Sequence, residues 1–431
     1  MAGGNGGKGD RERDNSLLND IRKRFIDRLS PSTLRSRIFW EATERLSRSR
    51  WNRPDWEADR ISLSHFLKST RDAYFKRAPV VWSNLLVPSE IIHGTECIPF
   101  YPEMASAVVA AAGLAPRFID RAAEAGFSPD ACSFHRCMLG CAVDGFLPEP
   151  DYLLTTNYPC DSAPLSFSYI SRLYGIPHDI VDIPLPGREA SLDLLAEQLR
   201  DVARYLAGLS GLKATRARER MEEAFEFSNQ ALGYLREIEE MRKRSDCMLD
   251  GKDAMGNISV LSACMGSKAG LEFYSKLAGE MRERGSEGDN SLRIMWMHLK
   301  PWYSQRIFEI LDNYNVRVVC EEYTHATWEH LDPVRPFHSL AEKVGGHFLV
   351  GPVERRASHL VKLAEDYRIE GAIHYNHWGC RQSCGGALQV KKALGARNIP
   401  TLLMDGDCVD EREYQEGQIG TRLEAFLESL S

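Results

Sequence analysis

The sequence predicts an α/β protein with two parallel β-sheets behind an N-terminal helical segment. Short apolar runs alternate with helical patterns from residue 81 to residue 190, and the same alternation returns after Gly251. Between these stretches the helical period continues from Ser191 to Arg244. Strands that alternate with helices are typical of parallel sheets. We therefore expect a first α/β domain at 81–190, linking long helices at 191–250 and a second α/β domain at 251–431.

The N-terminal residues divide into a tail and a helical segment. Residues 1–15 are polar and rich in glycine, and we expect a disordered tail there. Residues 16–80 carry helical patterns with a break at Ser30-Pro31-Ser32, and Ser62 or Ser64 can cap the last pattern. The expected helices are Leu17–Leu29, Thr33–Leu46 and Ser62–Tyr74.

The apolar runs of the two α/β regions are short enough to be strands, and longer periodic patterns between them indicate helices. The long helical stretch is interrupted at Gly208–Gly211, which predicts two helices instead of one. In the first region the expected strands are Tyr152–Thr156 and Ile180–Ile183, and the expected helices are Pro88–Ile92, Tyr101–Ala112 and Ser128–Asp144. In the second region the expected strands are Ile258–Ala263, Ile294–His298, Val316–Val319, Ala372–Tyr375 and Thr401–Leu403.

The composition is ordinary for a soluble globular protein, with 43% hydrophobic and 27% charged residues in 431. A formal net charge of −7 argues against a nucleic-acid partner, which requires clustered Lys and Arg. No run approaches the ~20 apolar residues that span a bilayer, and the polar amino terminus fits no secretory signal. We therefore expect a cytoplasmic protein without a membrane contact. Eleven cysteines in such a protein favour metal binding or catalysis over a disulfide framework.

Cys380 is the most informative cysteine because it follows the apolar run Gly371–His377 in the segment HWGCRQSCGG. It lies at the carboxyl end of a predicted strand, and ligands of open α/β sheets bind in the crevice beyond such ends. The two glycines that close the segment let the backbone approach a bulky ligand. The spacing from Cys380 to Cys384 matches neither common zinc pairs nor the dense cysteine run of ferredoxins.

Cys132 and Cys160 each meet the predicted start of a helix. In SPDACSFHRCMLGC, Ser128 or Asp130 can cap a helix that begins near Cys132, where the helix dipole favours the thiolate that binds iron or zinc. In TTNYPCDSAP, Cys160 follows a predicted strand, in a turn that can cap the next helix. An inert buried thiol at Cys132 and a small turn residue at Cys160 are the alternatives. Three thiols at one inferred crevice favour a metal centre.

The other cysteines are weaker candidates. Cys97 and Cys264 lie near predicted element ends but lack a close polar partner in the sequence. We expect the remaining thiols of the two α/β regions to pack in the interior, namely Cys137, Cys141, Cys247, Cys320 and Cys408.

Glu103 is the candidate catalytic acid or base. In IPFYPEMAS it precedes a helix of alanines and valines, so its carboxylate is expected beside an apolar surface. Burial there raises the pKa of a carboxyl group toward values useful for proton transfer. The alternative is a carboxylate that interacts only with the helix dipole.

Several motifs in order resemble those of one family, the 2-hydroxyacyl-CoA dehydratases with their relatives the benzoyl-CoA reductases. The similar part of the chain runs from about Leu86 to the end. The segment VPSEIIHGTECIPFYPEMA resembles the family's Pro-x-Glu helix followed by a proline, an aromatic residue and a glutamate. SPDACSFHRCMLG, YPCD and GCRQSCGG resemble its first, second and third cluster-cysteine motifs. The tail IPTLLMDGDCVDEREYQEGQIGTRLEAFLESL resembles the family's ending.

The resemblance implies two flavodoxin-like, that is Rossmann-like and doubly wound, parallel-sheet domains with an iron–sulfur cluster between them. By the same resemblance Cys132, Cys160 and Cys380 hold one [4Fe–4S] cluster with its fourth iron open, and Glu103 lies in the active site. The implied activity is radical dehydration of an acyl-CoA substrate, a 2-hydroxyacyl-CoA, after an ATP-dependent activator protein supplies one electron. The iron then acts as a Lewis acid on the departing hydroxyl. The implied partner is a second homologous dehydratase subunit in a heterodimer, or a second copy of this chain.

Three features leave alternatives open. Cys384 and Cys97 are extra thiols, which raises the alternative of a double-cubane cluster. The polar N-terminal extension and the lead-in YNHWGC depart from the commonest pattern, so the acyl group is not specified. A benzoyl-CoA-type or double-cubane reductase subunit, or a non-catalytic electron-relay subunit, would carry the same cysteines.

Overall fold

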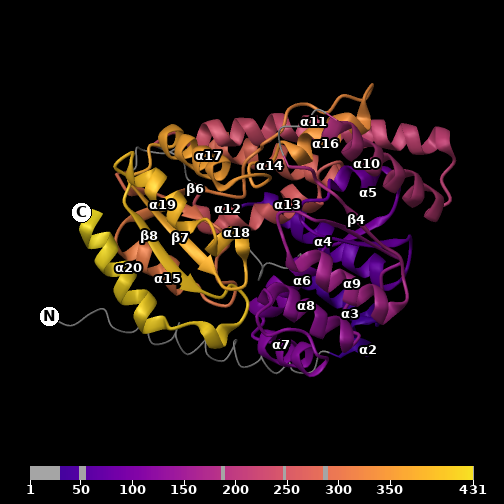
Figure 1. The fold of residues 1–431 in the computed structure, drawn as a ribbon, viewed down its shortest axis with the longest axis horizontal. Helices are drawn as coiled ribbons and strands as arrows, with labels where there is room; N and C mark the ends of the chain where they lie inside the picture. Colours follow the sequence, from indigo (N-terminus) through magenta and orange to yellow (C-terminus); the bar gives the residue numbers. More distant parts are fainter. Residues whose placement is uncertain (1–29, 48–54, 186–189, 246–248, 285–289, 431) are drawn as a thin grey trace.

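The computed structural model describes residues 30–47, 55–185, 190–245, 249–284 and 290–430. Within these residues the chain forms two four-stranded sheets, and all neighbouring strands are parallel. Figure 1 shows the N-terminal part in indigo and magenta beside the C-terminal part in orange and yellow. The α/β class and the two parallel sheets predicted from the sequence are confirmed.

In the described residues before the first sheet there are three helices: α2 (Pro31–Leu34), α3 (Arg37–Ser47) and α4 (Ala58–Tyr74). The single helix expected at 33–46 is therefore two helices, and the Ser30 hydroxyl caps the first of them by accepting the Thr33 N–H. The third helix begins at Ala58, so the caps expected at Ser62 and Ser64 are wrong: both lie inside the helix. The expected tail at 1–15 and the expected helix at 17–29 lie outside the described residues.

The first sheet has the order β2-β1-β3-β4. Its β3 coincides with the expected strand, and β4 begins two residues before the expected one. Strands β1 and β2 were missed because they have four and three residues, too few for a period to appear. The strands are β1 (Val80–Ser83), β2 (Ile98–Phe100), β3 (Tyr152–Thr156) and β4 (His178–Val181). The helices are α5 (Ser89–Gly94), α6 (Pro102–Ala111), α7 (Ala115–Glu124), α8 (Ser133–Val143) and α9 (Ser162–Tyr174).

The two long helices expected between the α/β regions are α10 (Ala190–Leu209) and α11 (Ala214–Arg242). Gly211 separates them with a positive φ of 72°, a conformation that glycine adopts without strain. Helix α11 packs on α5, which lies between β1 and β2 of the first sheet, and on α14 (Lys268–Arg284), which precedes the second sheet. It therefore connects the two sheets physically as well as in sequence, along the upper edge of Figure 1.

The second sheet has the order β6-β5-β7-β8. The strand expected at 258–263 is wrong, because these residues form helix α13 (Ile258–Ala263). The strands are β5 (Leu292–Met297), β6 (Val316–Glu321), β7 (Gly371–His377) and β8 (Thr401–Gly406). The remaining helices are α12 (Gly251–Ala254), η1 (Met255–Asn257), α15 (Arg306–Asn313), α16 (Pro336–Gly345), α17 (Val353–Asp366), α18 (Arg381–Cys384), α19 (Ala387–Gly395), η2 (Glu411–Glu413) and α20 (Glu416–Leu430).

Two buried ion pairs anchor the carboxyl end of β6. Arg242 at the end of α11 donates to both carboxylate oxygens of Glu321, at 2.6 and 2.7 Å. Arg356 on α17 likewise donates to both carboxylate oxygens of Glu322, at 2.6 and 2.8 Å. Removing one partner of such a pair leaves a buried charge uncompensated and costs about 3–5 kcal/mol. These pairs fix the loop after β6, which faces the cavity described below.

None of the helices in the described ranges is long and apolar enough to cross a membrane.

Candidate functional site

A cavity of about 870 Å³ lies where the carboxyl ends of the two sheets face each other. The segments that follow β1, β2 and β3 in the first sheet contribute to its wall, and so do those that follow β5, β6 and β7 in the second. The carboxyl ends of parallel strands are the usual ligand-binding edge of an α/β sheet. Here two such edges share one cavity, so this cavity is the candidate site.

The structure brings all four predicted site residues to the wall of this cavity: Glu103, Cys132, Cys160 and Cys380. Cys132 immediately precedes α8, Cys160 lies between β3 and α9, and Cys380 lies between β7 and α18. Two of the thiols therefore come from the first α/β region and one from the second. The crevice inferred from the sequence exists, and it is formed by both sheets together.

The backbone of the Cys380 loop touches the backbone of Cys132. Gly379 has a φ of 73°, and a Cβ atom there would lie 2.9 Å from both the Cα and the N of Cys132. No real Cβ approaches backbone atoms so closely, so only glycine fits. This contact between the two regions sets the distance between two of the three thiols.

The Cys380 loop is also connected to the Cys160 turn. Arg381 Nε donates to Asp161 Oδ2 at 2.6 Å, and Gln382 Nε2 donates to the Pro159 carbonyl at 3.4 Å. The arginine and aspartate side chains are about half exposed, so this pair contributes little stability by itself. It does occupy Asp161, which therefore does not cap α9 as the sequence suggested.

Burial raises the pKa of all three thiols. For Cys132 burial is the largest cause, followed by the proximity of Cys380 and then Cys160. For Cys160 burial is followed by Glu103 and Cys380, and for Cys380 burial again comes first, opposed by nearby backbone amides. The expectation that the helix start favours a Cys132 thiolate is therefore wrong for the metal-free chain. Ser128 and Asp130 do not cap α8 either, since Cys132 itself is the residue at the cap position and makes no capping hydrogen bond.

The donor set nevertheless fits an iron–sulfur cluster. Cys380 and Cys160 both raise the pKa of Cys132, so the three thiols interact, and a thiol that coordinates a metal is deprotonated outright. Among the described residues no three His, Cys, Asp or Glu side chains converge tightly enough for a single metal ion. A four-iron cluster is bound by thiolates on different irons, so it requires thiols that surround a larger volume.

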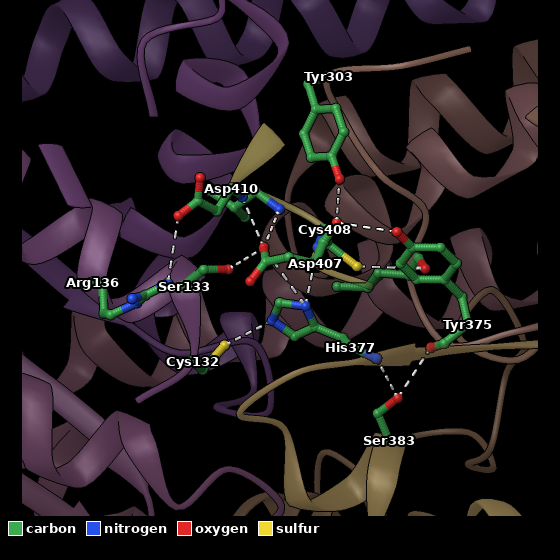
Figure 2. A network of polar contacts seen from close by, with 12 residues as sticks. Cys132, Ser133, Arg136, Tyr303, Tyr375, His377, Ser383, Asp407, Cys408 and Asp410 are labelled. Atoms are coloured by element: carbon green, nitrogen blue, oxygen red, sulfur yellow. Dashed lines mark hydrogen bonds and ion pairs between the residues drawn. The ribbon is translucent and has the colours of Figure 1, made fainter. Parts of the chain in front are cut away.

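Two buried histidines face two of the thiols. His377 Nε2 lies 3.2 Å from Cys132 Sγ, and His135 Nε2 lies 3.3 Å from Cys160 Sγ. Figure 2 shows His377 between Cys132 on one side and the Asp407–Cys408 backbone on the other. Burial lowers the pKa of both imidazoles, that of His135 to about 3. Both rings are therefore neutral and can hydrogen-bond to sulfur.

Glu103 lies in the first turn of α6 with 8% of its surface exposed. Its Oε2 atom is buried without a hydrogen-bond partner among the described residues, and its Oε1 atom lies 3.7 Å from His135 Nε2. Burial raises the pKa of Glu103 to about 8. The carboxyl group is thus mostly protonated at neutral pH, and its contact with neutral His135 is not an ion pair. This is the environment that the sequence predicted for an acid–base residue.

The other cysteines do not join this group. Cys97 is buried near the Thr95 and Leu206 carbonyls, and Cys264 is buried at the end of α13; neither lines the cavity. Cys384 lies in α18 with its thiol exposed, 3.3 Å from the His377 carbonyl. The interior packing expected for the others is confirmed for Cys137, Cys141, Cys320 and Cys408, while Cys247 lies outside the described residues.

Sequence reasoning missed the polar residues that hold the thiols. His135 and Cys160 are 25 residues apart in the sequence, and His377 and Cys132 are 245 residues apart, so helical spacing signals neither contact. Asp407 and Ser133 are 274 residues apart, yet Ser133 Oγ donates to Asp407 Oδ1 at 2.6 Å. No local sequence pattern predicts such a contact.

The fold and the site define an α/β protein with a thiol-lined cavity between the carboxyl edges of two parallel sheets. Residues 84–430 match the family described as 2-hydroxyglutaryl-CoA dehydratase, D-component. The chain belongs to this family, which confirms the resemblance inferred from its motifs. The match includes all four predicted site residues.

Similar proteins include both kinds of dehydratase subunit. The chain is 22% identical over 396 residues to the lactoyl-CoA dehydratase subunit alpha of Anaerotignum propionicum, which covers 84% of this chain and 93% of that protein. It is 23% identical over 372 residues to the (R)-phenyllactyl-CoA dehydratase alpha subunit of Clostridium sporogenes, covering 81% and 89%. It is also 23% identical over 351 residues to the beta subunit named for the same organism and activity, covering 78% and 91%.

The Gly379 contact predicts that Gly379→Ala destabilises the chain. The positive φ costs an alanine about 1–2 kcal/mol, and the Cβ would also collide with Cys132. Gly113→Ala is the matched control, because Gly113 has the same φ of 73° with no atom near its Cβ position. Urea unfolding should show a larger loss of stability for Gly379→Ala than for Gly113→Ala. Equal losses would show that the collision does not occur.

Glu103 is expected to make stability depend on pH. Its folded pKa of about 8 lies above the ordinary value of 4.5, so the folded state binds this proton more tightly than the unfolded state. The stabilisation is complete below the ordinary value and is lost as the pH rises through about 8. The stability of Glu103→Gln relative to the wild type should therefore increase between about pH 5 and about pH 9. Urea unfolding of the iron-free proteins measures this difference, and a difference independent of pH contradicts the raised pKa.

Proposed function

We propose that this chain is the iron–sulfur subunit of a 2-hydroxyacyl-CoA dehydratase. The observation that carries the proposal is the convergence of three thiols, one buried and two partly exposed, and one mostly protonated carboxyl group on a single cavity. Membership of the 2-hydroxyglutaryl-CoA dehydratase D-component family supports it, as do the names of the relatives, all of them dehydratase subunits.

Cys132, Cys160 and Cys380 would hold one [4Fe–4S] cluster, which leaves the fourth iron without a protein thiolate. When bound, this group would supply one-electron transfer and Lewis acidity beside the substrate. The chain's own contribution is to hold three thiols on one cavity wall, where their raised pKa values keep them protonated until a metal centre displaces the protons. Burial of the site also limits access of water and oxygen.

The proposed reaction removes the 2-hydroxyl group and one 3-hydrogen of the substrate as water and forms a C2–C3 double bond. The activating electron is returned, so the net reaction involves no oxidation. Glu103 lies on the cavity wall and can take the proton from C3 in the fraction of molecules in which its carboxyl group is ionised at neutral pH. Its pKa of about 8 makes it a stronger base than an exposed carboxylate, and its unpartnered Oε2 atom is available to the substrate.

The cavity favours an acyl group without a second charge. Among the described residues that line it, Lys343 and Arg381 are the only permanent cations. Lys343 Nζ lies 2.7 Å from Glu90 Oε1, and Arg381 is paired with Asp161. Neither is available for a distal substrate carboxylate, so we propose an apolar acyl chain. Aromatic neighbours such as Phe134 and Trp302 on the wall suit such a chain.

A catalytic role is favoured over electron relay or cluster storage, because a relay subunit has no use for a cavity of about 870 Å³ beside its cluster. A benzoyl-CoA-type reductase is the alternative activity. The proposed partners are a second homologous subunit, since relatives include alpha and beta subunits, and an ATP-dependent activator. We also propose that each sheet belongs to a flavodoxin-like domain, because the order β2-β1-β3-β4 follows the flavodoxin pattern.

Anaerobically purified protein is expected to contain four irons and four acid-labile sulfides per chain, and Ser substitution of Cys132, Cys160 or Cys380 should remove most of this iron. The hard hydroxyl of serine replaces a soft thiolate that iron–sulfur clusters prefer. Cys97→Ser is the matched control for Cys132→Ser, since Cys97 is 5% and Cys132 7% exposed but Cys97 lies off the cavity. Wild-type iron in all three variants would disprove the ligand assignment. Eight irons, half of them lost in Cys384→Ser, would favour a double-cubane cluster instead.

Glu103→Gln should fold and retain the cluster while turnover falls by ~10²–10⁴-fold, the typical contribution of general acid–base catalysis. The amide keeps the shape of the carboxyl group and removes its titrating proton. Turnover is measured with the partner subunit, activator, ATP and an apolar 2-hydroxyacyl-CoA. Unchanged turnover removes Glu103 from the reaction, and loss of the cluster would assign it a structural role.

A further inference from the structure

His377 differs from His135 and His298, two other buried histidines of the site, because hydrogen bonds fix its direction at both ring nitrogens. The Cys408 backbone N–H donates to His377 Nδ1 at 3.0 Å. A neutral imidazole carries its single proton on one nitrogen, so Nδ1, which accepts, leaves the proton on Nε2. That nitrogen lies 3.2 Å from Cys132 Sγ. The Cys132 sulfur therefore receives a hydrogen bond from a donor that cannot reverse its direction.

We propose that His377 is a positioning residue that donates an Nε2–H hydrogen bond to the sulfur of Cys132 and thereby raises the reduction potential of the cluster. The inference rests on the proposed cluster. Hydrogen bonds to cluster sulfurs are one of the means by which proteins set such potentials, because they stabilise the negative charge gained on reduction. Here the bond is buried, with His377 only 1% exposed, so water does not compete for it.

One carboxylate holds both ends of this hydrogen bond, as Figure 2 shows. Asp407 Oδ1 accepts the Ser133 hydroxyl at 2.6 Å, and Ser133 directly follows Cys132. The same oxygen accepts the N–H groups of Val409 and Asp410 at 2.7 and 2.8 Å. These two amides belong to the turn that presents the Cys408 N–H to the imidazole. The position of the sulfur and the direction of the donor thus depend on one side chain.

The backbone of His377 is held separately. Its N–H donates to Ser383 Oγ at 2.9 Å, and the Ser383 hydroxyl donates to the Tyr375 carbonyl at 3.1 Å. Ser383 belongs to α18, the helix that follows Cys380. His377 therefore connects the loop of one candidate ligand with the sulfur of another.

His135 shows what is special about this arrangement. Its Nε2 atom lies 3.3 Å from Cys160 Sγ, but its Nδ1 atom faces the Ser166 hydroxyl, which can either donate or accept. The direction of the His135 contact is therefore not determined by a backbone amide. His298 offers a second contrast: its ring stacks on His377 with centroids 5.7 Å apart, and its Nδ1 atom has no partner among the described residues.

The test is the midpoint potential of the cluster in the anaerobically purified full chain, measured by spectroscopic redox titration. His377→Phe removes both nitrogens while keeping the ring, and its potential should shift to a more negative value with iron content unchanged. His377→Gln places an amide N–H near the former Nε2 atom and should recover part of the shift. His298→Phe, which keeps the stacked ring and touches no thiol, should leave the potential at the wild-type value.

A wild-type potential in His377→Phe overturns the inference while leaving the cluster itself in place. Absence of iron from the wild-type chain overturns the proposed function instead, so the two failures are distinguishable. If His377→Phe does not fold, the inference is tested instead by pulsed electron paramagnetic resonance of the reduced wild-type cluster with ¹⁵N-labelled histidine. A weak ¹⁵N coupling that His377→Gln abolishes supports the hydrogen bond. The same coupling in both proteins contradicts it.

Discussion

The contact between the loop after β7 and the first residues of α8 is the interaction on which the whole site depends. Gly379 lies against the backbone of Cys132, His377 reaches the Cys132 sulfur, and Ser133 binds the Asp407 carboxylate in the turn after β8. Each contact joins the ligand-binding edge of one sheet to the ligand-binding edge of the other sheet. Without them the two edges would still be well-formed parallel sheets, but the thiols would belong to separate crevices.

The polar groups around this contact are arranged to remain neutral or to be paired. Burial raises the pKa of the thiols and of Glu103 and lowers that of the histidines. Full charges nearby are buried in mutual pairs, such as Glu322 with Arg356. A buried site without free charges gains most from a bound cationic centre, because that centre can convert the thiols to thiolates at little electrostatic cost. The same surroundings keep a proton on Glu103 near neutral pH.

Much of the candidate site could be predicted from the sequence, because the residues with suitable chemistry also stand at recognisable positions in the fold. Apolar runs predict the strands before Cys160 and Cys380, and the carboxyl ends of parallel strands lie at the same edge of a sheet. Short runs were less informative: β1 and β2 gave no visible period, and Ile258–Ala263 is apolar enough for a strand but folds as a helix. The expectation of a thiolate at Cys132 was wrong, because burial, which depends on tertiary packing, raises the pKa of this thiol more than the helix start lowers it. The Asp407 and His377 contacts join residues more than two hundred positions apart, beyond the reach of any local pattern.

The location of the iron tests the central claim most directly. Crystals of the anaerobically purified protein, measured with X-rays just above and just below the iron absorption edge, give an anomalous difference map that shows iron alone. We expect a single compact peak in the cavity between Cys132, Cys160 and Cys380, within bonding distance of all three sulfurs. Iron bound elsewhere, or a cavity without an iron peak in a chain that contains iron, would contradict the assignment of these thiols as the cluster site.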